Sequence, residues 1–149
     1  MDMRVTADLL RQPIFRDMTA DQVGILLDLS DERIYRDRDP VIRITETNPD
    51  LFIVAEGGVE VRTATGDVLA TMGQGSVFGE VSIVDEMPAS ATVLSQGMTR
   101  LNVIHRKTLH ALLDGDPKMK AQLMENLARI LAGRLRAMNA HIMVGRMDD

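Results

Sequence analysis

The middle of the chain alternates apolar and polar residues over short segments. Between residues 32 and 104, turn-forming Gly, Pro, Asn and Asp residues separate these segments about every 8 to 10 positions. Alternation with a period of two is typical of half-buried strands, and this turn spacing favours a β-sandwich, roll or barrel. We expect seven or eight strands in all. The segments with the strongest strand pattern are 42–44, 51–54, 59–61, 68–72, 91–95 and 100–104.

Helical spacing replaces this alternation near the N-terminus. Thr19 and Gln22 have the spacing of a capping box, and Val23, Leu26 and Leu27 follow at helical intervals. The pattern predicts a helix over about 19–29. A shorter helical turn is expected over 7–12, with a break and an apolar anchor at 13–15.

Helical spacing also returns after residue 104. A short helix is predicted over 108–113, and Asp116 with Pro117 then forms a typical helix start, because Pro at the first helical position loses no hydrogen bond. An apolar stripe of about six turns follows. Its members are Leu123, Leu127, Leu131, Leu135, Met138 and Ile142.

Two interpretations of this stripe are open. It packs entirely on the protein's own core, or it packs partly on the core and partly on a second copy of the chain. The second is favoured, because the helix is long for one small roll to cover and Met124, Ala128 and Ala132 widen its apolar surface. It predicts a homodimer through Leu123, Leu127, Leu131, Leu135 and Met138.

Composition narrows the protein class. A chain of 149 residues with 45% hydrophobic and 26% charged residues is expected to form one domain over 1–149. It has no cysteine, signal sequence or apolar run of membrane-spanning length. These features predict a cytoplasmic protein without a membrane partner.

Charge is distributed unevenly along the chain. Residues 1–117 carry 11 Lys and Arg against 19 Asp and Glu, a balance of −8, whereas residues 118–149 carry 6 against 3, a balance of +3. An acidic body repels a nucleic-acid backbone, and the basic tail lacks the aromatic residues that stack on single strands. DNA binding is therefore not expected unless the chain is a fragment of a larger protein.

The segment most informative about function runs from Gly75 to Val93. It consists of a glycine turn (Gly75-Ser76-Val77-Phe78-Gly79), the carboxylate of Glu80, a short apolar stretch, and a return of small residues, Pro88-Ala89-Ser90-Ala91. Backbone N–H groups of such a turn can bind an anion while Glu80 accepts hydrogen bonds from hydroxyls. A phosphate joined to a sugar fits this combination, although a plain β-turn with a buried phenylalanine fits the residues alone equally well.

This segment resembles the phosphate-binding cassette of the cyclic-nucleotide-binding domain family, with the layout of a catabolite-activator-like sensor domain over about 10–140. The resemblance implies a mainly β fold with flanking helices. Its centre would be an eight-stranded β-roll, or jelly roll, over about 32–104, preceded by a helical segment and followed by a short and a long helix over about 106–142. We call residues 75–93 the cassette segment. The resemblance implies ligand-binding roles for Phe78, Gly79, Glu80, Val81, Ser82, Ala89, Ser90 and Ala91.

One departure from the family pattern concerns the phosphate. The family's phosphate-binding arginine has its place at Ala89, and no Lys or Arg occurs between residues 64 and 99. Ordinary cyclic AMP or cyclic GMP binding is therefore expected to be weak or absent, because an arginine–phosphate contact is a strong charge-assisted hydrogen bond. Either Arg62 or Arg100 enters the pocket, or the ligand is another small anion, or no ligand binds. The family also tends to place glycines around an Asp in the loop before residue 51. In this chain that loop, residues 45–50, contains no glycine.

Other chemistry has little support in the sequence. His105, His110 and His141 are the only histidines, and their spacing does not indicate a metal site. We find no nucleophile, base and orienting group together, so no catalytic residue is assigned and the protein is not expected to be an enzyme. Three functions stay open: a signalling domain that senses a small ligand, a ligand-free dimerisation or docking module, and the sensor half of a transcription regulator lacking its helix-turn-helix.

Overall fold

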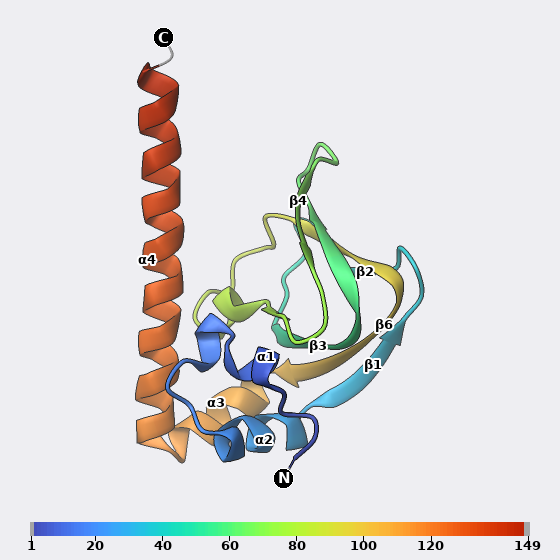
Figure 1. Cartoon of the computed structure of the whole chain (residues 1–149), viewed down its shortest axis with the longest axis vertical. Coiled ribbons are helices and arrows are strands. Elements are labelled where there is room, and N and C mark those ends of the chain that lie inside the picture. Colours follow the sequence, from blue (N-terminus) through green and yellow to red (C-terminus); the bar gives the residue numbers. More distant parts are fainter. Residues whose placement is uncertain (1, 148–149) are drawn as a thin grey trace.

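Six antiparallel strands form one curled sheet in the computed structural model, which describes the backbone of residues 2–147 and the side chains of residues 2–140. The central order is β1-β6-β3-β4, while β2 pairs with β6 and β5 pairs with β3. Figure 1 shows the sheet closing into a roll. The strands are β1 (Asp31–Tyr35), β2 (Pro40–Ile42), β3 (Asp50–Arg62), β4 (Val68–Met72), β5 (Val77–Phe78) and β6 (Thr92–His105).

Helices gather at one end of this roll, and the last of them runs far beyond it. The longest, α4 (Pro117–Met147), stands beside the roll with its first turns against the other helices (Figure 1). Among residues 2–147 no helix is both long and apolar enough to cross a membrane. The remaining helices are α1 (Ala7–Leu10), the 3-10 helix η1 (Pro13–Phe15), α2 (Ala20–Asp28), the 3-10 helix η2 (Glu80–Ile83) and α3 (Arg106–Asp114).

Strand β3 is buried on both faces. Leu51 and Ile53 belong to the cluster that packs the helices, whereas Phe52 and Val54 point into the interior of the roll. Side chains on a strand alternate between its two faces, so this four-residue apolar run serves two cores at once. Inside the roll, Phe52 stacks on Phe78 with ring centroids 4.9 Å apart, and each fully buried side chain of this kind is worth about 1.5–3 kcal/mol.

The predicted fold class is confirmed, but the strand count differs. Six strands rather than eight are present within residues 2–147, because β3 and β6 each unite two predicted strands. The glycines expected to form a turn at 57–58 instead lie inside β3, where the pairing register with β6 shifts. A Cβ on Gly57 would lie 2.5 Å from the carbonyl oxygen of Met98, so glycine permits the close approach of two bent strands.

The predicted N-terminal helices are present. The side chain of Thr19 accepts a 3.1 Å hydrogen bond from the backbone N–H of Gln22, whose side chain accepts one from the N–H of Thr19 at 2.9 Å. This reciprocal capping box begins α2 as predicted. Ile14 and Phe15 of η1 are buried in the helical cluster, which confirms the apolar anchor at 13–15.

The apolar stripe of α4 divides into two parts. Leu123 and Leu127 are fully buried in the protein's own helical cluster, and Leu131 packs against its edge. Leu135 and Met138 are each 60% exposed, and the side chain of Ile142 lies outside the described residues. Packing on the chain's own core therefore accounts for the first half of the stripe only.

A buried amide joins α4 to the N-terminal segment. The Nδ2 group of Asn126 donates hydrogen bonds to the carbonyl oxygens of Ile14 at 2.9 Å and Arg16 at 2.8 Å. The Asn126 side chain also accepts a hydrogen bond from Gln122, one turn earlier, at 3.0 Å. Because its donor satisfies two backbone carbonyls at once, Asn126 fixes η1 on the surface of α4.

Asn126→Ala is expected to lower the free energy of unfolding by about 1–3 kcal/mol, since it leaves buried carbonyl groups without a donor. Urea unfolding followed by circular dichroism measures this change. Gln122→Ala is the matched control, because it removes only the hydrogen bond that Asn126 accepts and leaves both hydrogen bonds from Asn126 to the carbonyl groups of Ile14 and Arg16 in place. An equal effect of the two substitutions would contradict the proposed link.

Candidate functional site

The cassette segment lines a cavity of about 480 Å³, which we call the cassette cavity. All eight residues that the resemblance singled out line it: Phe78, Gly79, Glu80, Val81, Ser82, Ala89, Ser90 and Ala91. Sequence reasoning did not assign the remaining walls, which come from other strands, from the loop before β3, from the rest of the cassette segment and from α4. They are Ile42, Asn48, Val61, Met72, Asp85, Met87, Pro88, Val93 and Arg134.

The turn at Gly79 depends on having no side chain. Gly79 adopts φ 81°, and a Cβ there would lie 2.6 Å from the carbonyl oxygen of Asp50. The Ser82 hydroxyl lies 2.5 Å from the carbonyl oxygen of Gly79 and 3.1 Å from that of Asp50. Ser82 therefore holds η2 against the start of β3, and any substitution of Gly79 would strain both the turn and this contact.

Ala89 is fixed by backbone pairing with the loop that precedes β3. Its N–H donates to the carbonyl oxygen of Glu46 and its carbonyl oxygen accepts from the N–H of Thr45, both at 2.9 Å. Its methyl group packs against the apolar cluster inside the roll. Asn48 forms the loop's turn without glycine, through hydrogen bonds to both backbone groups of Asp50. Ala89, to which the resemblance assigned the place of the arginine, is thus held in a defined position and carries no charge.

A cationic side chain lines the cavity, and it comes from α4, which the sequence analysis did not connect with the site. Arg134 of α4 forms an ion pair with Glu80, whose side chain is 9% exposed while that of Arg134 is 55% exposed. Neither Arg62 nor Arg100 lines the cavity, so both suggested substitutes were wrong. Arg134 lies three residues after Leu131 and four before Met138, so it shares the apolar face of α4. This position was the one sequence feature that could have pointed to a contact between Arg134 and the rest of the protein.

The two arginines suggested from the sequence have other partners. Arg62 lies 2.7 Å from Glu60, and its hydrogen bond lowers the pKa of that carboxyl below its ordinary value. Arg100 pairs with Glu32 at 3.5 Å and with Glu56 at 3.4 Å. Both arginines are therefore held on the strands by neighbouring carboxylates.

The charge around the cavity does not favour an anion. Glu80 and Asp85 line it, and Arg134 is the one Lys or Arg that does so among residues whose side chains are described. One guanidinium against two carboxylates leaves the walls with a formal charge of −1. A phosphate would meet this charge at short range, where Coulomb energies are large.

The histidines have structural partners. His105 Nδ1 lies 2.7 Å from Asp50, His105 Nε2 lies 3.3 Å from Asp31, and His110 Nε2 lies 2.8 Å from the carbonyl oxygen of Ile83. The described side chains contain no group of three or more His, Cys, Asp or Glu that could hold a metal ion. The side chain of His141 lies outside the described residues.

The roll, its cassette segment and the long helix beside the cavity define a class of ligand-sensing domain. A model of the cyclic nucleotide-binding domain matches residues 32–116. The chain therefore belongs to the cyclic nucleotide-binding domain family.

Two of the following three relatives agree with this assignment by name, and the other is named as an enzyme. The chain is 32% identical over 128 residues to the cyclic AMP receptor protein of Thermus thermophilus, an alignment covering 83% of this chain and 57% of that protein. It is 28% identical over 142 residues to glutaminase 1 of Bradyrhizobium diazoefficiens, covering 95% of this chain and 23% of that one. The crystal structure of the Thermus thermophilus catabolite activator protein superposes with a TM-score of 0.77 at 30% identity, covering 89% of this chain and 62% of that structure. The chain thus spans less than two thirds of the length of these relatives.

The contact between Glu80 and Arg134 is testable with a double-mutant cycle. Arg134→Met should lower the free energy of unfolding by about 1 kcal/mol, because it leaves the buried Glu80 carboxylate without its cation. Adding Glu80→Gln should recover most of that loss, because the double variant has no unpaired charge. Urea denaturation of the wild type, both single variants and the double variant gives the coupling energy. A coupling energy near zero would show that the pair does not hold α4 against the cassette segment.

Proposed function

We propose that the chain is a regulatory, non-catalytic domain that senses a small ligand in the cassette cavity, with weak or altered binding of cyclic nucleotides. The observation that carries this proposal is the cavity itself. All eight residues to which the resemblance assigns ligand binding line it, among them Ala89 and the buried Glu80. In the proposed binding mode Glu80 accepts hydrogen bonds from a sugar and Ala89 faces the phosphate. Family membership and the similarity to a cyclic AMP receptor protein support the class of ligand.

Weak binding follows from the balance of charge. A hydrogen bond to a charged group is worth about 1.5–3 kcal/mol, so the arginine's absence at position 89 lowers affinity by roughly 10- to 150-fold. Arg134 offsets part of this loss only if it turns from Glu80 to the phosphate. After that movement the Glu80 carboxylate has only the ligand's hydroxyl groups as partners. Arg134 therefore cannot pair fully with both Glu80 and the phosphate.

Isothermal titration of cyclic AMP and cyclic GMP tests the proposal. The wild type should bind weakly or not at all, and Ala89→Arg should tighten binding by roughly 10- to 150-fold, because it adds a charge-assisted contact to the phosphate. Ala89→Gln is the matched control, since it adds a long polar side chain without charge. Micromolar binding by the wild type would contradict the role given to Ala89, and no gain in Ala89→Arg would contradict the proposed position of the phosphate.

Homodimerisation through α4 is a second part of the proposal. Leu135 and Met138 lie at the exposed end of a stripe whose beginning is buried in the protein's own core, and they expose apolar area to solvent. A second copy packed along the same face would remove that area from water. This observation also favours the alternative function of a ligand-free dimerisation or docking module.

Leu135→Asp is expected to shift the protein toward the monomer, because it places a charge in the proposed apolar contact. Sedimentation velocity over a range of concentrations measures the change. Leu69→Asp on β4 is the matched control, since Leu69 is 62% exposed against 60% for Leu135 but lies away from α4. A monomeric wild type, or equal effects of the two substitutions, would rule out this interface.

The role of the whole protein is proposed only in outline. The match to part of a cyclic AMP receptor protein suits the sensor half of a transcription regulator, and the match to 23% of glutaminase 1 suits a regulatory segment joined to an enzyme. In both cases the domain acts on a partner instead of catalysing a reaction. The cytoplasmic location stays a prediction from the sequence.

A further inference from the structure

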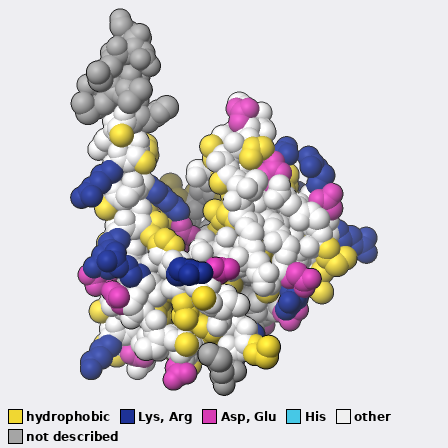
Figure 2. All heavy atoms as spheres, in the orientation of Figure 1, with side chains coloured by type: hydrophobic (Ala, Val, Ile, Leu, Met, Phe, Trp, Pro, Cys, Tyr) yellow, Lys and Arg dark blue, Asp and Glu magenta, His cyan; other side chains and the backbone are white. Residues whose placement is uncertain are grey.

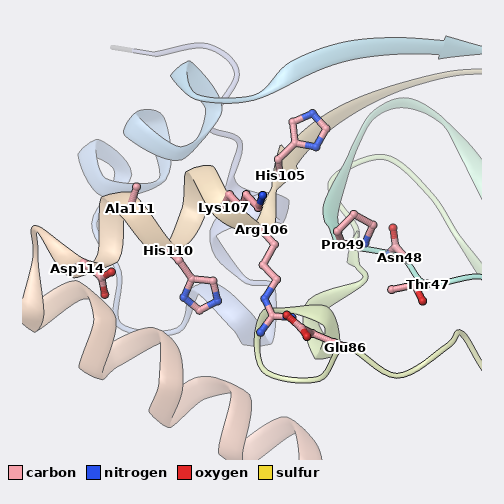
Figure 3. Close-up of a pocket in the computed structure, with 10 residues that line it drawn as sticks. All are labelled: Thr47, Asn48, Pro49, Glu86, His105, Arg106, Lys107, His110, Ala111 and Asp114. Atoms are coloured by element: carbon pink, nitrogen blue, oxygen red, sulfur yellow. The ribbon is translucent and has the colours of Figure 1, made fainter.

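A second cavity, of about 880 Å³, lies between the start of α3, the loop before β3 and Glu86 of the cassette segment. We call it the α3 cavity. Figure 3 shows the Arg106 side chain extended from the start of α3 toward Glu86, with His110 on one side of it and the loop Thr47–Pro49 on the other. It is lined by Thr47, Asn48, Pro49, Glu86, His105, Arg106, Lys107, His110, Ala111 and Asp114.

Arg106 is a preformed site for a carboxylate. Its guanidinium lies 2.8 Å from the Glu86 carboxylate, yet the two side chains differ sharply in exposure: 22% for Arg106 and 78% for Glu86. The arginine is therefore held by its surroundings, whereas the acid reaches it from an exposed loop. A pair with one solvent-exposed partner is weak, so a competing carboxylate can replace Glu86 at little cost.

The remaining charges of the α3 cavity favour an anion. The Asp114 carboxylate is paired with Lys120 at 2.8 Å, and this hydrogen bond lowers the pKa of Asp114. Lys107 forms no ion pair with any side chain that the structure describes. Counted as for the cassette cavity, the walls hold Arg106 and Lys107 against Glu86 and Asp114, and this formal charge of zero becomes +1 once Glu86 is displaced. Pro49 and Ala111 add apolar surface beside this charge.

The geometry points to a second ligand site: we propose that the α3 cavity binds a small organic acid, whose carboxylate replaces that of Glu86 on Arg106 while its apolar part packs on Pro49 and Ala111. This site adjoins the cassette cavity, with which it shares the lining residue Asn48. Asp85 and Met87 line the cassette cavity while Glu86, between them, lines the α3 cavity, so the same loop forms part of both walls.

Titration with benzoate, followed by two-dimensional ¹H–¹⁵N NMR of the full chain without nucleotide, tests the proposal. Benzoate should give saturable shifts at the backbone amides of Lys107 and Ala111 and at the Nε–H group of Arg106. Benzamide, which has the same ring without the charge, should give none. Inorganic phosphate should bind more weakly than benzoate, because it gains nothing from the apolar wall.

Two variants make the test specific. Glu86→Gln should tighten benzoate binding by about two- to fivefold, because it removes the competing carboxylate from an exposed position. Arg106→Gln should weaken it by tenfold or more. Equal shifts with benzamide, equal binding of phosphate, an unchanged affinity in Glu86→Gln, or shifts confined to Gly79 and Ser90 would each overturn the proposal. Because no nucleotide is present, the outcome does not depend on whether the cassette cavity binds one.

Discussion

The double burial of β3 is the constraint on which the other parts of this structure depend. Its apolar run faces the helical cluster with Leu51 and Ile53 and the interior of the roll with Phe52 and Val54. The strand also pairs with β4, β5 and β6, so it positions β5 at the entrance to the cassette segment. Asp50, its first residue, supplies the carbonyl oxygen against which Gly79 and Ser82 pack. Helices, roll and cassette cavity are thus placed relative to one another by one strand.

Much of the fold could be predicted from the sequence, because its local signals agree with its tertiary structure. The capping box at Thr19 and the Asp116-Pro117 start begin real helices, and the apolar run 51–54 lies in a real strand. The glycines at 57–58 could not be interpreted in this way. Glycine permits both a turn and a close approach of two backbones, and only the three-dimensional course of β6 decides between them.

The candidate site was predictable only where its residues are consecutive. Residues 78–82 and 89–91 come together because a short turn and a strand return place them there. Arg134 is 54 positions from Glu80, so no short-range pattern connects the two. Its position depends on how α4 packs, and that packing depends on long-range contacts such as those of Asn126 with η1. The local sequence identified Glu80, whereas its partner Arg134 is determined by tertiary packing.

The ion pair between Glu80 and Arg134 lies partway along α4, and basic side chains gather on this helix in Figure 2. From Arg134 to Met147 the helix continues for 13 residues, or about 20 Å at 1.5 Å per residue. Because this stretch is helical throughout, it can act as a rigid arm. If the helix pivots near Arg134, a tilt of about 10° moves its far end by about 3.5 Å, which is slightly more than the length of a hydrogen bond. Under the proposed function, a ligand that changes the hydrogen bonding of Glu80 would therefore produce its largest displacement far from the cavity, at the end of α4.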